Sequence, residues 1–356
     1  MFLADLESIL TVCLIISLIV ILILWYLKGY DGKFNLKRSL YKIPQNLSTL
    51  DVGYIVKGEV KDKDVNSLVL YLASKNYLRI EEIKDSFQLV KLKEYRKKDE
   101  VKVFFDELFK DRDTVVEDEL FNSFYKVTDE IKNYKNDLSH VHNLYFYNNS
   151  VTIMIADLIV ITNLFFITTI VYLETLGNEV NYGLIFLFMI FYLITYLPIR
   201  GMNSLTKFIS RMIMLLCLFF VLVVGFGLTK NILILNLLIN IIIVMLMNLV
   251  ILIMPKRNII GRKYFEQIKR FKNSINDLDE KKLKELLKEN KNYVFDIFPY
   301  VYTLGITKNL IDIYTKVDDK LPKYVKMKDE KDVRKNFRFL KQVAGNLARR
   351  PGDEHY

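Results

Sequence analysis

Long apolar runs alternate with charged stretches along this chain. Five runs are about as long as a helix must be to cross roughly 30 Å of hydrocarbon, and they lie at 9–27, 151–173, 182–199, 209–228 and 231–254. The first run has an acidic leading flank and no small-residue cleavage site, so it predicts an anchor helix rather than a cleaved signal peptide. The pattern therefore predicts a polytopic α-helical membrane protein.

The two kinds of stretch also predict domain boundaries. We expect a short extracytoplasmic N-terminus at 1–8, the anchor helix at 9–27 and a soluble region at 28–150. A four-helix transmembrane block at 151–254 is followed by a small helical cytoplasmic subdomain at 255–317 and a basic C-terminal tail at 318–356.

In the first soluble region the apolar positions change from helical to alternating spacing. Behind a cap at Asp64, the spacing predicts a helix over 64–76 with one buried face, and two strands follow at 77–83 and 87–92. The helical positions are Val65, Leu68, Val69 and Leu72, and the strand positions are Leu78, Ile80, Phe87 and Leu89. Helices followed by a two-strand wing predict a cytoplasmic α+β winged-helix-like module over 44–92.

A winged helix raises the question of DNA binding. A recognition helix needs basic and amide side chains that reach bases and phosphates. The helix at 64–76 offers only Asn66, Lys75 and Asn76, and the wing is acidic. We therefore expect no nucleic-acid partner, and a protein contact or a structural role instead.

Two further helices are predicted downstream of this module. One helical face collects Val101, Phe104, Phe105 and Leu108, and a second collects Leu120, Phe124, Val127, Ile131 and Tyr134. Both faces are expected to pack on the winged module. His140 and His142 follow, but no cysteine or carboxylate cluster accompanies them, so a metal site is not expected.

The C-terminal region predicts more amphipathic helices. Residues 261–275 and 279–290 each have one apolar face, and 293–305 supplies an apolar segment to cover them. Gly305 suits a left-handed helix end, and Pro299 suits a helix start or a bend. We expect this segment to form the core of a small helical subdomain; insertion of its aromatic residues into a membrane surface is the alternative.

The positive charge of the chain is unevenly placed. The formal net charge is +10, and residues 255–356, with 25 basic and 15 acidic residues, carry all of that excess. Basic residues flank the ends of the runs that face both soluble regions, whereas the opposite ends are mainly acidic. This asymmetry predicts a cell-membrane protein with its N-terminus outside and both soluble regions in the cytoplasm.

The same excess predicts a lipid partner. A solvated basic face is the alternative, but a basic region beside a membrane is suited to the anionic inner leaflet. The candidate lipid-contact residues are Lys256, Arg257, Arg262, Lys263, Lys269, Arg270 and Lys272.

Few polar residues lie inside the predicted spans. Asp157 is the clear ionisable one, and it is interpreted as a buried partner, a snorkelling group or part of an ion path. Asn236, Asn240 and Asn248 fall near one face of the fifth span and, with Asn163 in the second, suit interhelical hydrogen bonds. No catalytic or phosphate-binding motif is present, so we expect neither an enzyme nor a cofactor.

Several segments together resemble a known bacterial family. The pieces "LSTLDVGYIVKG", "YLASKNYLRI", "FFDELF" and "FDIFPYVYTLGI" are similar to the YciQ-like predicted membrane proteins, over about residues 34–313. In the last piece Pro299, Tyr300, Leu304 and Gly305 match a Pro-Tyr-Ala-x-Ala-Leu-Gly pattern, while Val301 and Thr303 depart from it.

The function of the YciQ-like family is unknown, so the resemblance implies no catalytic residue. Its members usually carry an extracytoplasmic β-domain ahead of the anchor, and here that domain is expected either to be encoded separately, as a partner, or to be dispensable. The sequence therefore predicts a membrane scaffold or signal relay that makes protein or lipid contacts. A component of a transport system that uses the polar residues of the spans is the alternative.

Overall fold

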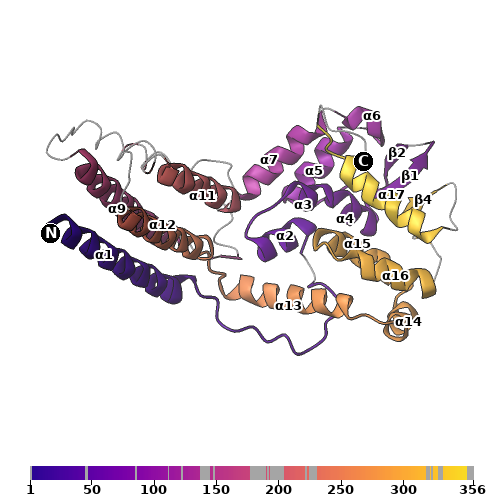
Figure 1. Ribbon diagram of the computed structural model, residues 1–356. Coiled ribbons are helices and arrows are strands. Elements are labelled where there is room, and N and C mark those ends of the chain that lie inside the picture. Colours follow the sequence, from indigo (N-terminus) through magenta and orange to yellow (C-terminus); the bar gives the residue numbers. More distant parts are fainter. Residues whose placement is uncertain are drawn as a thin grey trace. The chain divides into compact units, whose positions relative to one another are not determined.

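The protein consists of two compact units, each formed from two separate stretches of the chain. The computed structural model describes residues 2–44, 47–84, 86–110, 112–121, 123–136, 145–146, 149–176, 190, 192, 204–220, 223, 231–317, 321, 324–327 and 332–350. Unit 1 comprises Met1–Gly32 and Phe146–Asn258, and unit 2 comprises Lys33–Tyr145 and Ile259–Tyr356 (Figure 1).

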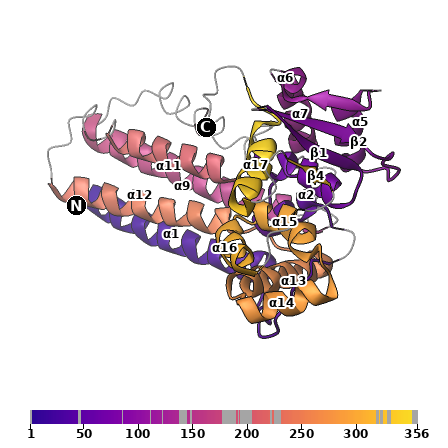
Figure 2. The ribbon, with the colours of Figure 1, turned by 90° about the vertical axis from the view of Figure 1, so that its right-hand side faces the viewer.

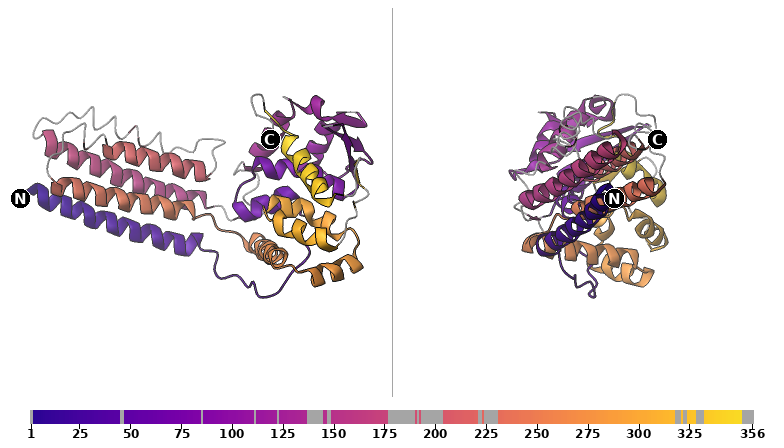
Figure 3. Two further views of the ribbon diagram at one scale, coloured as in Figure 1. Left: turned by 45° about the vertical axis from the view of Figure 1, so that its right-hand side comes forward. Right: turned by 60° about the vertical axis from the view of Figure 1, so that its left-hand side comes forward.

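Unit 1 is a bundle of apolar helices that lie side by side (Figure 3). They are α1 (Phe2–Leu24), continued by the short π-helix η1 (Trp25–Gly29), α9 (Ser150–Leu176), α11 (Ser204–Phe220) and α12 (Asn231–Leu252). Leu14, Leu164 and Val244 are fully buried between the helices, whereas residues such as Val12 and Leu216 point outward and are more than half exposed. A helix that is apolar on its outer face as well as its inner face suits a lipid environment.

Three described helices are long and apolar enough to cross a membrane, namely Ser8–Gly29, Val151–Tyr172 and Ile234–Leu252. They correspond to the first, second and fifth predicted runs. The fourth run is described as far as the end of α11 and gives a shorter apolar helix, Phe208–Phe219. The third run, 182–199, lies almost entirely outside the described residues.

One end of the bundle is held by polar contacts between three chain segments. The amide nitrogen of Asn149, just before α9, donates to the carbonyl oxygens of Lys28 (2.6 Å) and Met254 (3.2 Å). Beside it, the guanidinium of Arg257 pairs with Asp31 at 2.8 Å. The ends of α1 and α12 thus meet the start of α9, so α9 runs antiparallel to both.

Unit 2 contains a four-stranded mixed sheet in the order β3-β2-β1-β4. The hairpin of β1 (Leu78–Ile83) and β2 (Ser86–Lys91) confirms the two predicted strands, and the four apolar strand positions predicted to share a face are all buried. β3 (Thr114–Val116) pairs antiparallel with β2, and β4 (Val325–Lys326) pairs parallel with β1. The sheet is therefore larger than a two-strand wing, because β3 of the first segment and β4 of the C-terminal segment each add a strand to it.

The first segment of unit 2 supplies six described helices around this sheet. They are α2 (Thr49–Lys57), α3 (Asp62–Asn66), α4 (Leu68–Ser74), α5 (Glu100–Phe109), α6 (Glu117–Leu120) and α7 (Phe124–Asn136). The helix predicted over 64–76 is two short helices that meet at Ser67. Asp64 is the third residue of α3 rather than its N-cap, and from there its carboxylate accepts the N–H of the N-cap residue Lys61. The expectation of one buried face was wrong, since every residue of α4 is buried.

The helices predicted after the hairpin are partly confirmed. α5 buries Val101, Phe104, Phe105 and Leu108 as expected. Of the second predicted face, Leu120, Phe124 and Ile131 are buried as expected. The prediction was wrong at Tyr134, which is half exposed, while α7 also buries Thr128 and Lys135. Lys135 is buried because two carboxylates meet it there, an arrangement that apolar spacing does not reveal.

The second segment of unit 2 forms α13 (Ile259–Asn276), α14 (Glu280–Glu289), α15 (Tyr293–Thr303), α16 (Thr307–Val317) and α17 (Val333–Asn346). α15 is central: it packs on α2 and α4 from the first segment and on α16 from its own (Figures 1 and 2). Val294, Phe298 and Val301 are fully buried there.

The expected division into a helical subdomain and a tail differs from the structure. Residues 324–327 and 332–350 are folded: β4 joins the sheet, and α17 buries Phe337, Leu340 and Val343. The apolar faces of the two segments cover each other, so the two soluble regions form one unit rather than two modules.

Candidate functional site

The family-like motif lies at the centre of unit 2. Pro299 is in the interior of α15 rather than at its start, and it has no N–H to donate to the carbonyl of Phe295 one turn earlier. That carbonyl instead accepts a hydrogen bond of 3.0 Å from the hydroxyl of Tyr324. The backbone oxygen of Tyr324 in turn accepts from the N–H of Ile80 in β1. Pro299 therefore creates the acceptor that connects α15 to the edge of the sheet.

The other motif residues also have structural partners. The hydroxyl of Tyr300 donates to the carbonyl of Leu47 at 2.9 Å, and two helical turns earlier the hydroxyl of Tyr293 donates to the carbonyl of Tyr41 at 2.7 Å. Leu304 caps α15, and Gly305 follows with φ +72° as the left-handed residue that ends the helix, as predicted. The N–H of Ile306 then bonds back to the carbonyl of Val301, which completes a Schellman motif.

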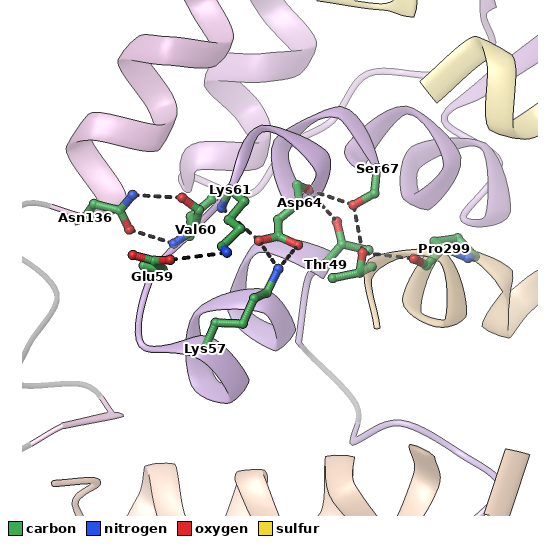
Figure 4. A network of polar contacts seen from close by, with 10 residues as sticks. Thr49, Lys57, Glu59, Val60, Lys61, Asp64, Ser67, Asn136 and Pro299 are labelled. Carbon is green, nitrogen blue, oxygen red and sulfur yellow. Dashed lines mark hydrogen bonds and ion pairs between the residues drawn. The ribbon is translucent and has the colours of Figure 1, made fainter. Parts of the chain in front are cut away.

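A buried carboxylate lies at the junction of α2 and α3 (Figure 4). Asp64 is fully buried, and both of its oxygens lie 2.5 Å from the ammonium of Lys57. The backbone N–H of Lys61 donates to it as well, at 2.9 Å. Burial raises the pKa of Asp64, and Lys57 offsets part of that shift. A side chain at Gly53 would lie 2.6 Å from this carboxyl group, so only glycine leaves room for it.

The backbone of the same residue begins a chain of hydroxyl contacts toward α15 (Figure 4). The hydroxyl of Ser67 donates to the carbonyl of Asp64 at 2.7 Å and accepts from Thr303 at 3.0 Å. Thr303 also lies 3.0 Å from the carbonyl of Pro299. These contacts connect the helices of the first segment to the motif in the second.

A buried cation joins three helices of the first segment. The ammonium of Lys135 in α7 lies 2.9 Å from Glu100 in α5 and 3.2 Å from Asp51 in α2. Burial by itself lowers the pKa of Lys135, but the two carboxylates outweigh it, so the net shift is upward. Asp51 also forms the capping box of α2 with Ser48. This triad serves to fix helices, and no sequence signal indicates it because Lys135 looks like an ordinary surface lysine.

The intramembrane candidates of unit 1 form two kinds of contact. Asp157 in α9 pairs with Arg211 in α11 through two bonds of 2.9 and 3.1 Å, which supports its interpretation as a buried partner. An ion path through Asp157 would require the carboxylate to leave Arg211. The sequence pattern does not indicate this pair, since the two residues lie 54 positions apart in the chain.

Among the asparagines, one bonds to a neighbouring helix and two bond within their own helices. Asn240 in α12 accepts from the hydroxyl of Thr11 in α1 at 3.1 Å, which confirms an interhelical bond. The amide groups of Asn163 and Asn248 donate to carbonyls one turn earlier in their own helices. Asn236 lies half-buried one turn before Asn240.

The candidate lipid-contact residues include several with protein partners. Arg257 pairs with Asp31 in unit 1. In unit 2, Arg262 and Arg270 donate to the carbonyls of Lys33 and Asn35, so both arginines hold the extended segment that enters the unit. Four lysines complete the set: Lys256 in unit 1 and Lys272 in unit 2 are half-buried, and Lys263 and Lys269 in unit 2 are exposed. At the start of α13, Ile259 and Ile260 are also exposed, at 80% and 56%.

A groove of about 600 Å³ lies in unit 2, and no sequence pattern indicated it. Its walls come from the segment before α2, from α4, from the loop before α5 and from α15. Five tyrosines line it: Tyr71, Tyr77, Tyr95, Tyr293 and Tyr300. Only the packing of these separate segments brings the aromatic rings together.

Comparisons with known proteins add no relative. No protein-family model, curated protein or solved structure matches the chain. The resemblance to the YciQ-like proteins therefore stays a prediction. Among the described residues, no group of three or more His, Cys, Asp or Glu side chains is arranged to hold a metal ion.

Proposed function

We propose that this chain is an integral membrane protein that acts as a scaffold or signal relay, with unit 1 as the anchor and unit 2 as the contact module. The observation that carries the proposal is the shared core of unit 2. Its two segments flank residues 146–258, which contain two of the helices able to span a membrane. β4 pairs with β1, and α15 packs on α2 and α4, across that gap in sequence.

A shared core restricts the topology. Because residues 145 and 259 belong to one folded unit, they lie on the same side of the membrane, and the chain between them crosses it an even number of times. Four predicted spans satisfy this condition. The anchor helix adds one crossing, so the N-terminus lies on the opposite side. The distribution of basic residues supports a cytoplasmic unit 2 and an N-terminus on the outside.

Protein and lipid are the proposed partners, and nucleic acid is not. The predicted candidate for a recognition helix, α4, is buried along its whole length and packs against α15 and α17, so it presents no face to a DNA groove. At the start of α13, the exposed Ile259 and Ile260 precede Lys263 and Lys269. Apolar side chains beside ammonium groups suit an anionic inner leaflet. A separately encoded outer domain is a further candidate partner for the N-terminal side.

Thiol labelling in cells tests the topology. In a background with Cys13→Ala and Cys217→Ala, single cysteines are introduced by Ser8→Cys, Lys98→Cys and Lys288→Cys, all at exposed positions. A membrane-impermeant maleimide should label the Ser8 variant in intact cells, and the other two only after permeabilisation. Labelling of only one of the Lys98 and Lys288 variants in intact cells would refute the claim that both segments of unit 2 lie on one side of the membrane. Labelling of both in intact cells would reverse the proposed orientation.

Hydrogen exchange tests the lipid contact. The full chain is placed in nanodiscs of phosphatidylcholine, alone or with phosphatidylglycerol, and exchange of α13 is compared. Anionic lipid should slow exchange at the start of α13, and raised salt should reverse part of the effect because surface charges are screened over roughly 8 to 10 Å. The double variant Lys263→Gln/Lys269→Gln should lose the response, whereas Lys98→Gln/Lys288→Gln should keep it. Identical exchange in both lipids would remove the lipid proposal.

A further inference from the structure

The groove of unit 2 has the size of a small-molecule site. Its volume of about 600 Å³ lies within the range of roughly 300 to 1,000 Å³ that ligand pockets occupy. Elements of both segments enclose it: Lys42, Pro44 and Leu47 come from the stretch before α2, further lining residues come from α4 and the loop before α5, and α15 completes the wall. The site thus exists only in the assembled unit.

The rings that line the groove are fixed in place. The hydroxyls of Tyr293 and Tyr300 donate to backbone carbonyls, and the hydroxyl of Tyr95 donates to Asp99 at 2.9 Å. Tyr71 packs edge-on against Tyr300, and Tyr77 packs edge-on against Tyr95. Four of these rings are at most 7% exposed and form rigid walls, so a planar ligand would stack mainly on Tyr77, the half-buried ring of the five.

Two hydroxyls at the groove are available to a ligand. Neither Tyr71 nor Tyr77 has a hydrogen-bond partner for its hydroxyl among the described residues, and neither hydroxyl is a fully buried atom, so both are open to solvent at the groove. Burial raises the pKa of Tyr71 to about 12, so its hydroxyl keeps its proton at neutral pH and serves as a donor. Both hydroxyls can therefore donate to a ligand that carries an acceptor.

The groove is also positively charged. Lys42, Lys75 and Lys97 line it, and in the part of the chain that the structure describes none of the three has a carboxylate within ion-pair distance. Its acidic lining residue is Asp296, which accepts a hydrogen bond from Asn290. Three ammonium groups against one carboxylate attract an anion, and phosphate is the anion that lysine binds as a point charge.

We propose that this groove binds a nucleotide, with the phosphates held by Lys42, Lys75 and Lys97 and the base stacked among the tyrosines. An aromatic wall beside a cluster of lysines is suited to a ligand that joins a planar ring to an anionic group. A lipid headgroup would use the lysines but leave the rings without a planar partner. Nucleotide binding in the groove depends on the chemistry of its walls and not on the orientation of the protein in the membrane.

Titration of the full chain in phosphatidylcholine nanodiscs tests the proposal. The probes are fluorescent mant-ATP and mant-GTP, with pyrophosphate and adenosine as competitors. We expect saturable binding that weakens as salt is raised, and competition by unlabelled nucleotide that is stronger than by pyrophosphate or adenosine alone. Competition by pyrophosphate as effective as by nucleotide would show that the rings contribute nothing, and this result would overturn the assignment of a nucleotide.

Matched variants assign binding to the groove. Lys75→Gln/Lys97→Gln removes two lining charges and the charge-assisted hydrogen bonds that they would give to phosphate, so binding should weaken about tenfold or more for the pair. Lys98→Gln/Lys288→Gln removes the same charge from exposed lysines outside the lining and should change affinity less than about twofold. Tyr77→Phe keeps the ring and removes its hydroxyl, so any change in nucleotide affinity measures the contribution of that hydroxyl to binding.

Three further outcomes would refute the proposal. The first is the absence of saturable binding by either nucleotide at millimolar concentration. The second is an equal weakening of binding in the lining and control variants, which would indicate a non-specific charge effect. The third is displacement of the probe by phosphatidylglycerol vesicles or by a phosphorylated peptide more readily than by nucleotide, which would assign the groove to a lipid or a protein.

Discussion

The hydrogen bond that Tyr324 donates beside Pro299 allows a specific test of how unit 2 is held together. Tyr324→Phe removes the hydroxyl that donates to the carbonyl of Phe295, and Tyr324 and Phe295 are both at most 5% exposed. Since Pro299 has no N–H, no intrahelical donor can replace it. A buried acceptor left without a partner costs about 1 to 3 kcal/mol, so we expect the free energy of unfolding to fall by that amount.

A second substitution isolates the cause. Pro299→Ala supplies a backbone N–H one turn after Phe295, so in that background the carbonyl keeps a donor when Tyr324 is changed. Tyr324→Phe should then cost less than about 1 kcal/mol, giving a coupling energy of about 1 to 2 kcal/mol between the two positions. This double-mutant cycle cancels the effect of losing the packing of the proline ring, because that loss is present in both proteins that carry Pro299→Ala.

The assay is urea unfolding of the full chain in detergent, with the folded fraction of unit 2 followed by pulse proteolysis. Trp25, the only tryptophan, belongs to unit 1, so intrinsic tryptophan fluorescence does not report on unit 2. Tyr71→Phe is the control, since its hydroxyl has no hydrogen-bond partner among the described residues and its removal should cost little. An equal cost of Tyr324→Phe in both backgrounds would refute the reasoning.

Three further predictions concern the buried groups of unit 2. Lys135→Met leaves two carboxylates without their cation and should lower the free energy of unfolding by about 3 kcal/mol in the same urea assay. Lys132→Met, at a more exposed ion pair, should lower it by less than about 1 kcal/mol. Equal losses in the two variants would show that the buried triad adds no stability. Gly53→Ala should destabilise unit 2, because the new methyl group meets a buried carboxyl group. Gly345→Ala, in an open helical position, should be neutral or stabilise the unit by up to about 1 kcal/mol. An unchanged stability of the Gly53→Ala protein would contradict the packing described. Burial raises the pKa of Tyr54 to about 12 from its ordinary value of about 10, so the stability of the folded state is unaffected by this group below pH 10 and falls as the pH rises from 10 toward 12. Absorbance at 295 nm should therefore show a fraction of tyrosines that ionise only as the protein unfolds, and titration of all tyrosines near pH 10 in folded protein would refute this.

Local sequence patterns anticipated many of the secondary-structure elements. Uninterrupted apolar runs correspond to α1, α9 and α12, because a helix in lipid must be apolar on every face. Alternation predicted β1 and β2, and helical spacing predicted α5, α13 and α14. Gly305 was assigned correctly as a helix end, since a left-handed residue there requires no knowledge of the rest of the fold.

Other features were settled only by long-range packing. β4 has two residues, too few for any alternation to show, and it forms because the edge of β1 offers backbone partners. The Asp157–Arg211 pair joins positions 54 residues apart, and Lys135 meets two carboxylates from other helices. Asp157 is conspicuous in the sequence, but Arg211 and Lys135 look like ordinary surface charges there until the fold brings their partners to them.

The sequence by itself determined which segments are apolar, where many of the helices and strands lie, and where positive charge gathers, because these properties depend on neighbouring residues alone. Tertiary structure decided that the two soluble regions share one core and that lysines and tyrosines from separate segments surround one groove. The physical reason is that the spacing of apolar residues shows which face of an element must be buried, but it does not specify which distant segment will cover that face.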